Sequence, residues 1–283
     1  MQPLTRSPLR RVIPWRLAAT ALMACVLSAC QAPDQALRDL AGHQGYQLQP
    51  LAAGPFVLML GVPEHSPHSS RLRLYIEGDG RAWATPTQPS LDPTPHTLLI
   101  AAVAMGDPAP GIYLARPCQF IRSRGCEVAL WTDRRFASEV VDSLDHAIST
   151  LKSRYGNRDF ELVGYSGGAA LALLLAARRD DVAQVQTVAG NLSPRRWAQQ
   201  LHLAPLDGSL EPLDYAERLA RIPQRHWLAA DDRVVPPALA LAYRQALGPN
   251  ACVELRTIVG ARHDHGWVEA WVQGRDTPIH CSR

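Results

Sequence analysis

The 283-residue chain lacks several patterns that would assign it to a common class. No basic run occurs beyond its first 30 positions, so we expect no nucleic-acid partner. It has neither a C-x-x-C pair nor Cys and His paired at ligand spacing, so we expect no metal site. We find no internal repeat and no low-complexity segment. The chain has only four phenylalanines, and no long apolar segment that would form the lid of a lipase. These absences argue against DNA-binding, zinc-dependent, repeat and lid-covered lipase proteins.

The N-terminus has the organisation of an export signal. Arg6, Arg10, Arg11 and Arg16 precede an apolar stretch over 17–27 that is too short to span a bilayer. It ends in Leu-Ser-Ala-Cys at residues 27–30, which resembles a bacterial lipobox. That resemblance implies removal of residues 1–29 and lipidation of Cys30. The alternative is an ordinary signal peptide with an incidental cysteine. Because Gln31 rather than aspartate follows, we expect an anchor in the outer membrane, facing the periplasm.

The remaining chain is long enough for one domain. About 250 residues bury a substantial core without cross-links. The leader carries four arginines and no acidic residue, so its removal changes the formal net charge from +3 to −1. We expect a lipidated tether over residues 30–51 and a folded domain over 52–283.

Four cysteines remain after the leader and the lipid site: Cys118, Cys126, Cys252 and Cys281. An even number in an oxidising compartment predicts two disulfides. Three pairings are possible, and we favour the two that are local in sequence, Cys118–Cys126 and Cys252–Cys281.

Short apolar runs alternate with helical patterns along the domain, which predicts an α/β fold with a mainly parallel sheet. Residues 192–224 are irregular and predict a small insertion. Strands are predicted over 56–60, 71–76, 128–131, 160–163, 182–189, 226–230 and 253–259. Helices are predicted over 136–155, 169–178, 236–247 and 267–272, and a helix or strand flank over 98–105.

The most informative motif is Gly-Tyr-Ser-Gly-Gly at residues 164–168. It lies between an apolar strand and a helix of small residues, the setting of a nucleophile elbow. A side chain at position 164 or 168 would crowd the tight turn that exposes Ser166. The N–H of Gly167, at the helix N-terminus, could face a developing oxyanion. The alternative is a plain Gly/Ser turn.

An acid and a base follow the serine in the order used by α/β-hydrolases. Asp232 precedes Val-Val-Pro after the strand at 226–230, and the adjacent Asp231 is the alternative. His263 stands in a Gly-x-x-His pattern after the last strand, and His265 is the alternative base. Both loops resemble the acid and histidine loops of that superfamily.

A second oxyanion donor is expected from the loop Glu-Gly-Asp-Gly-Arg at residues 77–81. Its glycines let the backbone approach a substrate carbonyl, so N–H groups near Asp79 or Gly80 are the candidates. An acidic Asp79 is unusual beside a developing negative charge. It could turn away, pair with Arg81, or bind a cationic substrate group.

Together these motifs resemble a proteobacterial α/β-hydrolase-fold lipoprotein over essentially the whole mature chain. The segment Tyr-Leu-Ala-Arg-Pro-Cys-Gln at 113–119 also resembles that family. Its Arg116 could bind a carboxylate or phosphate, or act structurally beside a disulfide.

The resemblance implies a serine hydrolase that cleaves an acyl ester, thioester or amide and requires no cofactor. The small number of phenylalanines and the lack of a long apolar lid favour a small or medium acyl group. Two alternatives stay open: a non-catalytic envelope-assembly lipoprotein on a hydrolase scaffold, and an acyltransferase using the same three residues. Beyond the acyl substrate, the implied partner is the membrane, through the lipid on Cys30.

Overall fold

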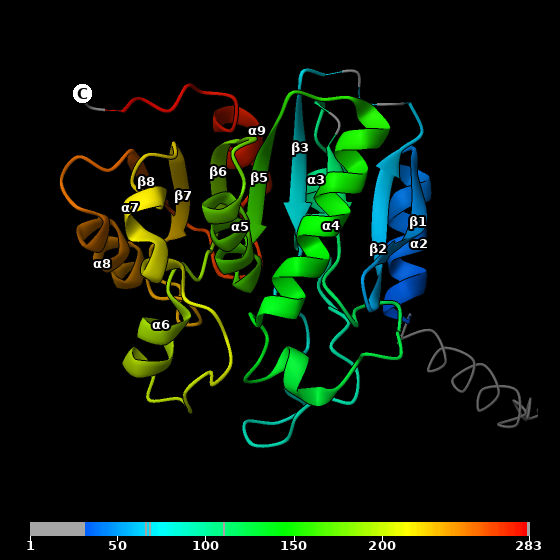
Figure 1. Ribbon diagram of the computed structural model, residues 1–283, viewed down its shortest axis with the longest axis horizontal. Coiled ribbons are helices and arrows are strands. Elements are labelled where there is room, and N and C mark those ends of the chain that lie inside the picture. Colours follow the sequence, from blue (N-terminus) through cyan, green and yellow to red (C-terminus); the bar gives the residue numbers. More distant parts are fainter. Residues whose placement is uncertain (1–31, 66, 68, 110, 282–283) are drawn as a thin grey trace, which may run out of the picture.

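The computed structural model describes residues 32–65, 67, 69–109 and 111–281 (Figure 1). The predicted export signal, Cys30 and Gln31 lie outside the described residues. Within the described part of the chain, no helix combines the length and apolar character needed to cross a membrane.

A single eight-stranded sheet organises the chain, in the order β1-β2-β4-β3-β5-β6-β7-β8. The first two strands pair antiparallel, as do β2 and β4, and the other neighbours are parallel. This confirms the predicted α/β fold with a mainly parallel sheet. The strands are β1 (Tyr46–Ala53), β2 (Phe56–Pro63), β3 (Arg71–Ile76), β4 (Ile112–Leu114), β5 (Asp159–Tyr165), β6 (Val182–Val188), β7 (Gln224–Ala229) and β8 (Val253–Ile258).

Helices cover both faces of this sheet (Figure 1). Between β6 and β7, in the region of the predicted insertion, the chain forms short helices rather than irregular structure. The helical elements are α2 (Pro33–His43), α3 (Leu99–Met105), η2 (Val128–Trp131), α4 (Ser138–Tyr155), α5 (Gly167–Arg178), α6 (Pro194–Gln200), η3 (Pro212–Tyr215), α7 (Ala216–Leu219), α8 (Pro237–Leu247) and α9 (Val268–Gly274).

Two hydrophobic cores lie on the two faces, because successive side chains of a strand point to opposite sides. On β3, Leu74 belongs to the core beneath α4, α5 and α8, while the next residue, Tyr75, belongs to the core with α2, α3 and α9. Leu162 and Val163 of β5 divide in the same way. Both faces of the central strands are therefore buried, and their parallel pairing places their carboxyl ends at the same edge of the sheet.

Two sequence expectations are wrong. Residues 128–131 form the 3₁₀ helix η2, because a four-residue apolar run has no period that separates strand from helix. The predicted tether is folded from Pro33 onward: α2 buries Leu37 and Ala41, and β1 pairs with β2. The apolar positions of this polar-looking segment lie on one helix face, which suffices to bury it.

Both predicted disulfides are present. The first joins Cys118 and Cys126, with Cα atoms 5.6 Å apart, and the second joins Cys252 and Cys281, with Cα atoms 4.7 Å apart. The first closes a short loop beside Arg116, and the second ties the C-terminal segment to the residue before β8.

Candidate active site

Ser166 occupies a sharp turn between β5 and α5. Its backbone φ of 48° and ψ of −120° lie in a region that non-glycine residues rarely adopt. The flanking glycines are required sterically. A Cβ on Gly164 would lie 2.5 Å from the Ala169 Cα, and one on Gly168 would lie 2.5 Å from the carbonyl oxygens of Ile76 and Glu77. The turn therefore presents the Ser166 hydroxyl at the carboxyl edge of the sheet.

Three side chains from three loops meet at this edge. His263 Nε2 lies 3.0 Å from Ser166 Oγ, and His263 Nδ1 lies 2.8 Å from Asp232 Oδ2. The other oxygen of Asp232 accepts hydrogen bonds from the backbone N–H groups of Val234 at 2.8 Å and Val235 at 2.9 Å. The Asp232 side chain is 1% exposed. A fixed, buried carboxylate thus orients the imidazole toward the serine.

The alternative residues lie outside this arrangement. The His265 side chain is 61% exposed and hydrogen-bonds Asp264 at 2.7 Å. Asp231 is exposed, whereas Asp232 turns inward. Tyr165, which sequence reasoning did not single out, packs its ring against the His263 ring with centroids 5.5 Å apart. Its hydroxyl donates to the His263 carbonyl at 3.3 Å, so it supports the histidine loop.

The loop after β3 lies against the serine turn. A Cβ on Gly78 would lie 3.3 Å from the Ser166 Cβ. The Gly78 peptide is held from both sides: its N–H donates to Glu77 Oε1 at 2.8 Å, and its carbonyl accepts from Gln119 Nε2 at 2.9 Å. Among the described residues, no acceptor is hydrogen-bonded to the N–H groups of Asp79, Gly80 or Gly167. Of these three residues, Asp79 and Gly80 line the cavity beside Ser166.

Glu77 is a buried carboxyl group beneath this loop. It is 1% exposed and also accepts a hydrogen bond from the Tyr113 hydroxyl at 2.8 Å. Burial raises the pKa of Glu77 to about 7, although the hydrogen bonds from Gly78 and Tyr113 and the charge of Arg116 act in the opposite direction.

Asp79 points its carboxylate at two arginines rather than at Arg81. It forms ion pairs with Arg116 and, at 3.0 Å, with Arg135. Burial opposes ionisation, but the two positive charges outweigh it and hold the pKa of Asp79 below its usual value. The pairing with Arg81, one of the alternatives above, does not occur. Arg135 had no motif by which sequence reasoning could have found it.

A cavity of about 470 Å³ opens above Ser166 and His263. Trp83, Tyr165 and Trp197 supply aromatic walls, and Arg135 and Asp79 form part of the lining. Trp197 comes from α6, so the insertion between β6 and β7 contributes one wall.

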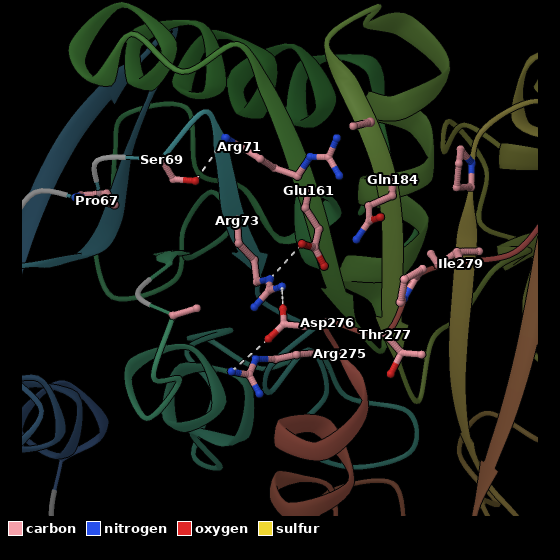
Figure 2. Close-up of a pocket in the computed structure, with 14 residues that line it drawn as sticks. Pro67, Ser69, Arg71, Arg73, Glu161, Gln184, Arg275, Asp276, Thr277 and Ile279 are labelled. Atoms are coloured by element: carbon pink, nitrogen blue, oxygen red, sulfur yellow. Dashed lines mark hydrogen bonds and ion pairs between the residues drawn. The ribbon is translucent and has the colours of Figure 1, made fainter.

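A larger cavity of about 750 Å³ lies at the opposite, amino edge of the strands (Figure 2). Figure 2 shows Arg73 and Arg275 turned toward carboxylates: Arg73 pairs with Glu161 at 3.0 Å and with Asp276 at 2.6 Å. Arg71 pairs with Asp159 at 2.6 Å. These cations are neutralised within the protein, and the Ser166 site lies at the other end of the sheet.

Groups of three or more His, Cys, Asp or Glu side chains placed to hold a metal ion do not occur in the described part of the chain.

Comparisons with known proteins match at the level of structure. No protein-family model matches the sequence, and neither does any curated protein. An α/β serine hydrolase homologue from Coxiella burnetii superposes with a TM-score of 0.55 at 16% identity, over 80% of this chain and 96% of that one. An esterase from Pyrococcus furiosus superposes with a TM-score of 0.57 at 13% identity, over 86% and 91%. Est1E from Butyrivibrio proteoclasticus, with ferulic acid bound, gives 0.58 at 15% identity, over 80% and 96%. The chain therefore has the α/β-hydrolase fold.

Proposed function

We propose that this protein is a serine hydrolase that cleaves an acyl ester, thioester or amide through an acyl-enzyme on Ser166. The observation that carries the proposal is the continuous pair of hydrogen bonds from Ser166 to His263 and from His263 to Asp232. A weakly nucleophilic alcohol becomes reactive when a base accepts its proton and a third group orients that base.

Ser166, His263 and Asp232 have different roles in the reaction. Ser166 Oγ attacks the substrate carbonyl carbon while His263 Nε2 takes the hydroxyl proton. Asp232 holds the imidazole in the required orientation and stabilises its positive charge. The leaving group departs with the proton from His263, and water then repeats these steps on the acyl-enzyme.

The negative charge that develops on the carbonyl oxygen needs hydrogen-bond donors. The Gly167 N–H, at the start of α5, has no partner within its helix. The N–H groups of Asp79 and Gly80 supply the second side of the oxyanion site. Donors of this kind contribute on the order of 3 kcal/mol each to transition-state stabilisation.

The decisive experiment is labelling with a fluorophosphonate probe. Ser166→Ala is expected to abolish labelling and ester turnover. Ser143→Ala is the matched control, because Ser143 is also a buried serine, but lies on α4 and donates to the Ala53 carbonyl. Equal labelling of wild type and Ser166→Ala would exclude a nucleophilic role for Ser166.

The acyl group is proposed to be small or medium in size, because the cavity is about 470 Å³ and has aromatic walls. Turnover of p-nitrophenyl esters of increasing chain length, with Ser166→Ala as the blank, tests this. A maximum at long chains would contradict it. Product analysis with added alcohols separates hydrolysis from acyl transfer.

We also propose that the chain is exported and anchored through a lipid on Cys30, on the outer membrane's inner face. The support is the sequence pattern at residues 27–30. Labelling of cells with a palmitate analogue should mark the wild type and Cys25→Ser, but not Cys30→Ser. Cys25 is the matched control because it lies in the same apolar stretch. Labelling of Cys30→Ser would refute this anchor, and fractionation of the envelope would test the membrane.

A further inference from the structure

A buried cluster of three charges stands beside the serine turn. The Asp79 carboxylate bridges Arg116 and Arg135, whose side chains are 4% and 5% exposed. The carboxylate itself is 20% exposed. Two positive charges and one negative charge give these three side chains a formal net charge of +1. Asp79 and Arg135 line the cavity, and Arg116 also interacts with the carboxyl group of Glu77.

Both arginines are held rigidly from behind. Arg116 Nη1 binds Asp79, and Arg116 Nη2 donates to the Arg135 carbonyl at 2.6 Å. Arg135 Nε donates to the Thr132 carbonyl at 2.5 Å. Aromatic rings pack against both guanidinium groups: Phe136 against Arg116 and Trp197 against Arg135. Guanidinium groups that are held in this way restrict the position of the carboxylate that they bind.

That carboxylate lies directly against the nucleophile's own turn. A Cβ on Gly167 would overlap the Asp79 carboxylate, so only glycine at position 167 permits this approach. Gly80, which follows Asp79 in the chain, has a φ of +61°, and a Cβ at this position would overlap the Pro93 carbonyl oxygen. These close contacts hold the loop that carries the N–H groups of Asp79 and Gly80 against the turn of Ser166.

We propose that Arg116, Asp79 and Arg135 act together as positioning residues for the oxyanion site. The arginines hold the Asp79 side chain, and through it the backbone N–H groups of residues 79 and 80. Pairing with two arginines offsets the negative charge of Asp79, which accounts for an acidic residue beside a developing oxyanion. We assign both arginines to positioning, because Arg116 binds Asp79 and the Arg135 carbonyl, and Arg135 binds Asp79 and the Thr132 carbonyl. This inference rests on the proposed function.

The test separates transition-state stabilisation from substrate binding. Asp79→Asn and Arg135→Lys are compared with wild type in kcat and KM for a p-nitrophenyl ester. A second readout is the affinity for an alkyl trifluoromethyl ketone. The serine oxygen adds to that ketone carbon, its proton passes to the histidine, and the ketone oxygen becomes an oxyanion. We expect kcat to fall by about 100-fold, the ketone affinity to fall by a similar factor, and KM to stay within about threefold.

Arg225→Lys is the matched control. Arg225 is a fully buried arginine that pairs with Glu254 and donates to two carbonyl groups, but it lies at the far end of β7. Its variant should retain kcat even if its thermal midpoint falls. Arg116→Lys keeps the test open should Asp79→Asn fail to fold, and circular dichroism establishes folding of each variant.

Three outcomes would overturn the inference while leaving the hydrolase proposal intact. They are an unchanged kcat in the folded variants, a raised KM at constant kcat, and a ketone affinity that does not follow kcat. The second would instead make the cluster a substrate anchor. A wild-type protein without Ser166-dependent turnover would refute the hydrolase proposal itself.

Discussion

His226 offers a direct test of how burial controls the stability of this fold. It lies on β7, is 0% exposed, and packs edge-on against the Tyr243 ring at 5.6 Å. Its Nδ1 is 2.9 Å from the Thr187 hydroxyl and its Nε2 is 3.2 Å from Gln224 Oε1. Because that amide oxygen can only accept, Nε2 carries a proton. In the neutral ring, Nδ1 accepts a hydrogen bond from the Thr187 hydroxyl.

Burial lowers the pKa of His226 from 6.5 to about 3. The unfolded chain binds a proton at this residue as the pH falls below about 6.5, whereas the folded protein does so only near pH 3. The free energy of unfolding therefore decreases across that window. A difference of about 3.5 pKa units at about 1.4 kcal/mol each corresponds to a loss of about 5 kcal/mol. About 3 kcal/mol of it is lost by about pH 4.

The assay is urea unfolding of wild type and His226→Asn between about pH 7.5 and about pH 4, compared at each pH. Lost packing lowers the free energy of unfolding of the variant by the same amount at every pH. Only the pH dependence of the difference between wild type and variant therefore reports on ionisation of the histidine. The difference should shrink by about 3 kcal/mol on acidification. His265→Asn, which removes a histidine whose side chain is 61% exposed, is the control. A difference that stays constant with pH would refute the reasoning.

Three further predictions concern the site. Glu77→Gln removes a carboxyl group whose pKa is raised by burial to about 7. In wild type, the folded state keeps a proton on this group that the unfolded state releases from about pH 4.5. The free energy of unfolding of wild type, measured with urea, should therefore fall by about 3 kcal/mol relative to the variant between about pH 4.5 and about pH 7. An equal difference at both ends of that range would contradict this. Asp232→Asn should lower kcat by about three to four orders of magnitude in ester assays, because an amide cannot hold the same imidazole tautomer or stabilise its charge. Near-normal kcat would remove Asp232 from the mechanism. Gly168→Ala places a Cβ 2.5 Å from two backbone carbonyl oxygens and should destabilise the fold by about 1–3 kcal/mol in thermal melts. Gly42→Ala, where a Cβ meets no atom within 4 Å, is the control and should be neutral or stabilising, and equal melts for both would contradict the steric argument.

Local chemistry was sufficient to predict much of this protein from its sequence. A serine between glycines, after an apolar strand and before a helix of small residues, specifies its own turn, because the steric limits act within a few residues. The alternation of strands and helices predicted the sheet, and proximity along the chain predicted both disulfides. The tether and the strand at 128–131 were wrong because short or sparse apolar patterns acquire their structure from what they pack against.

Only the tertiary structure decided which side chains meet. Sequence could not choose between His263 and His265, since their directions depend on how the loop after β8 folds against Tyr165. It left three possibilities for the Asp79 carboxylate, and the sheet brings it between Arg116 and Arg135, residues 37 and 56 positions away. Contacts between distant segments follow from the packing of whole strands and helices, which no local pattern encodes.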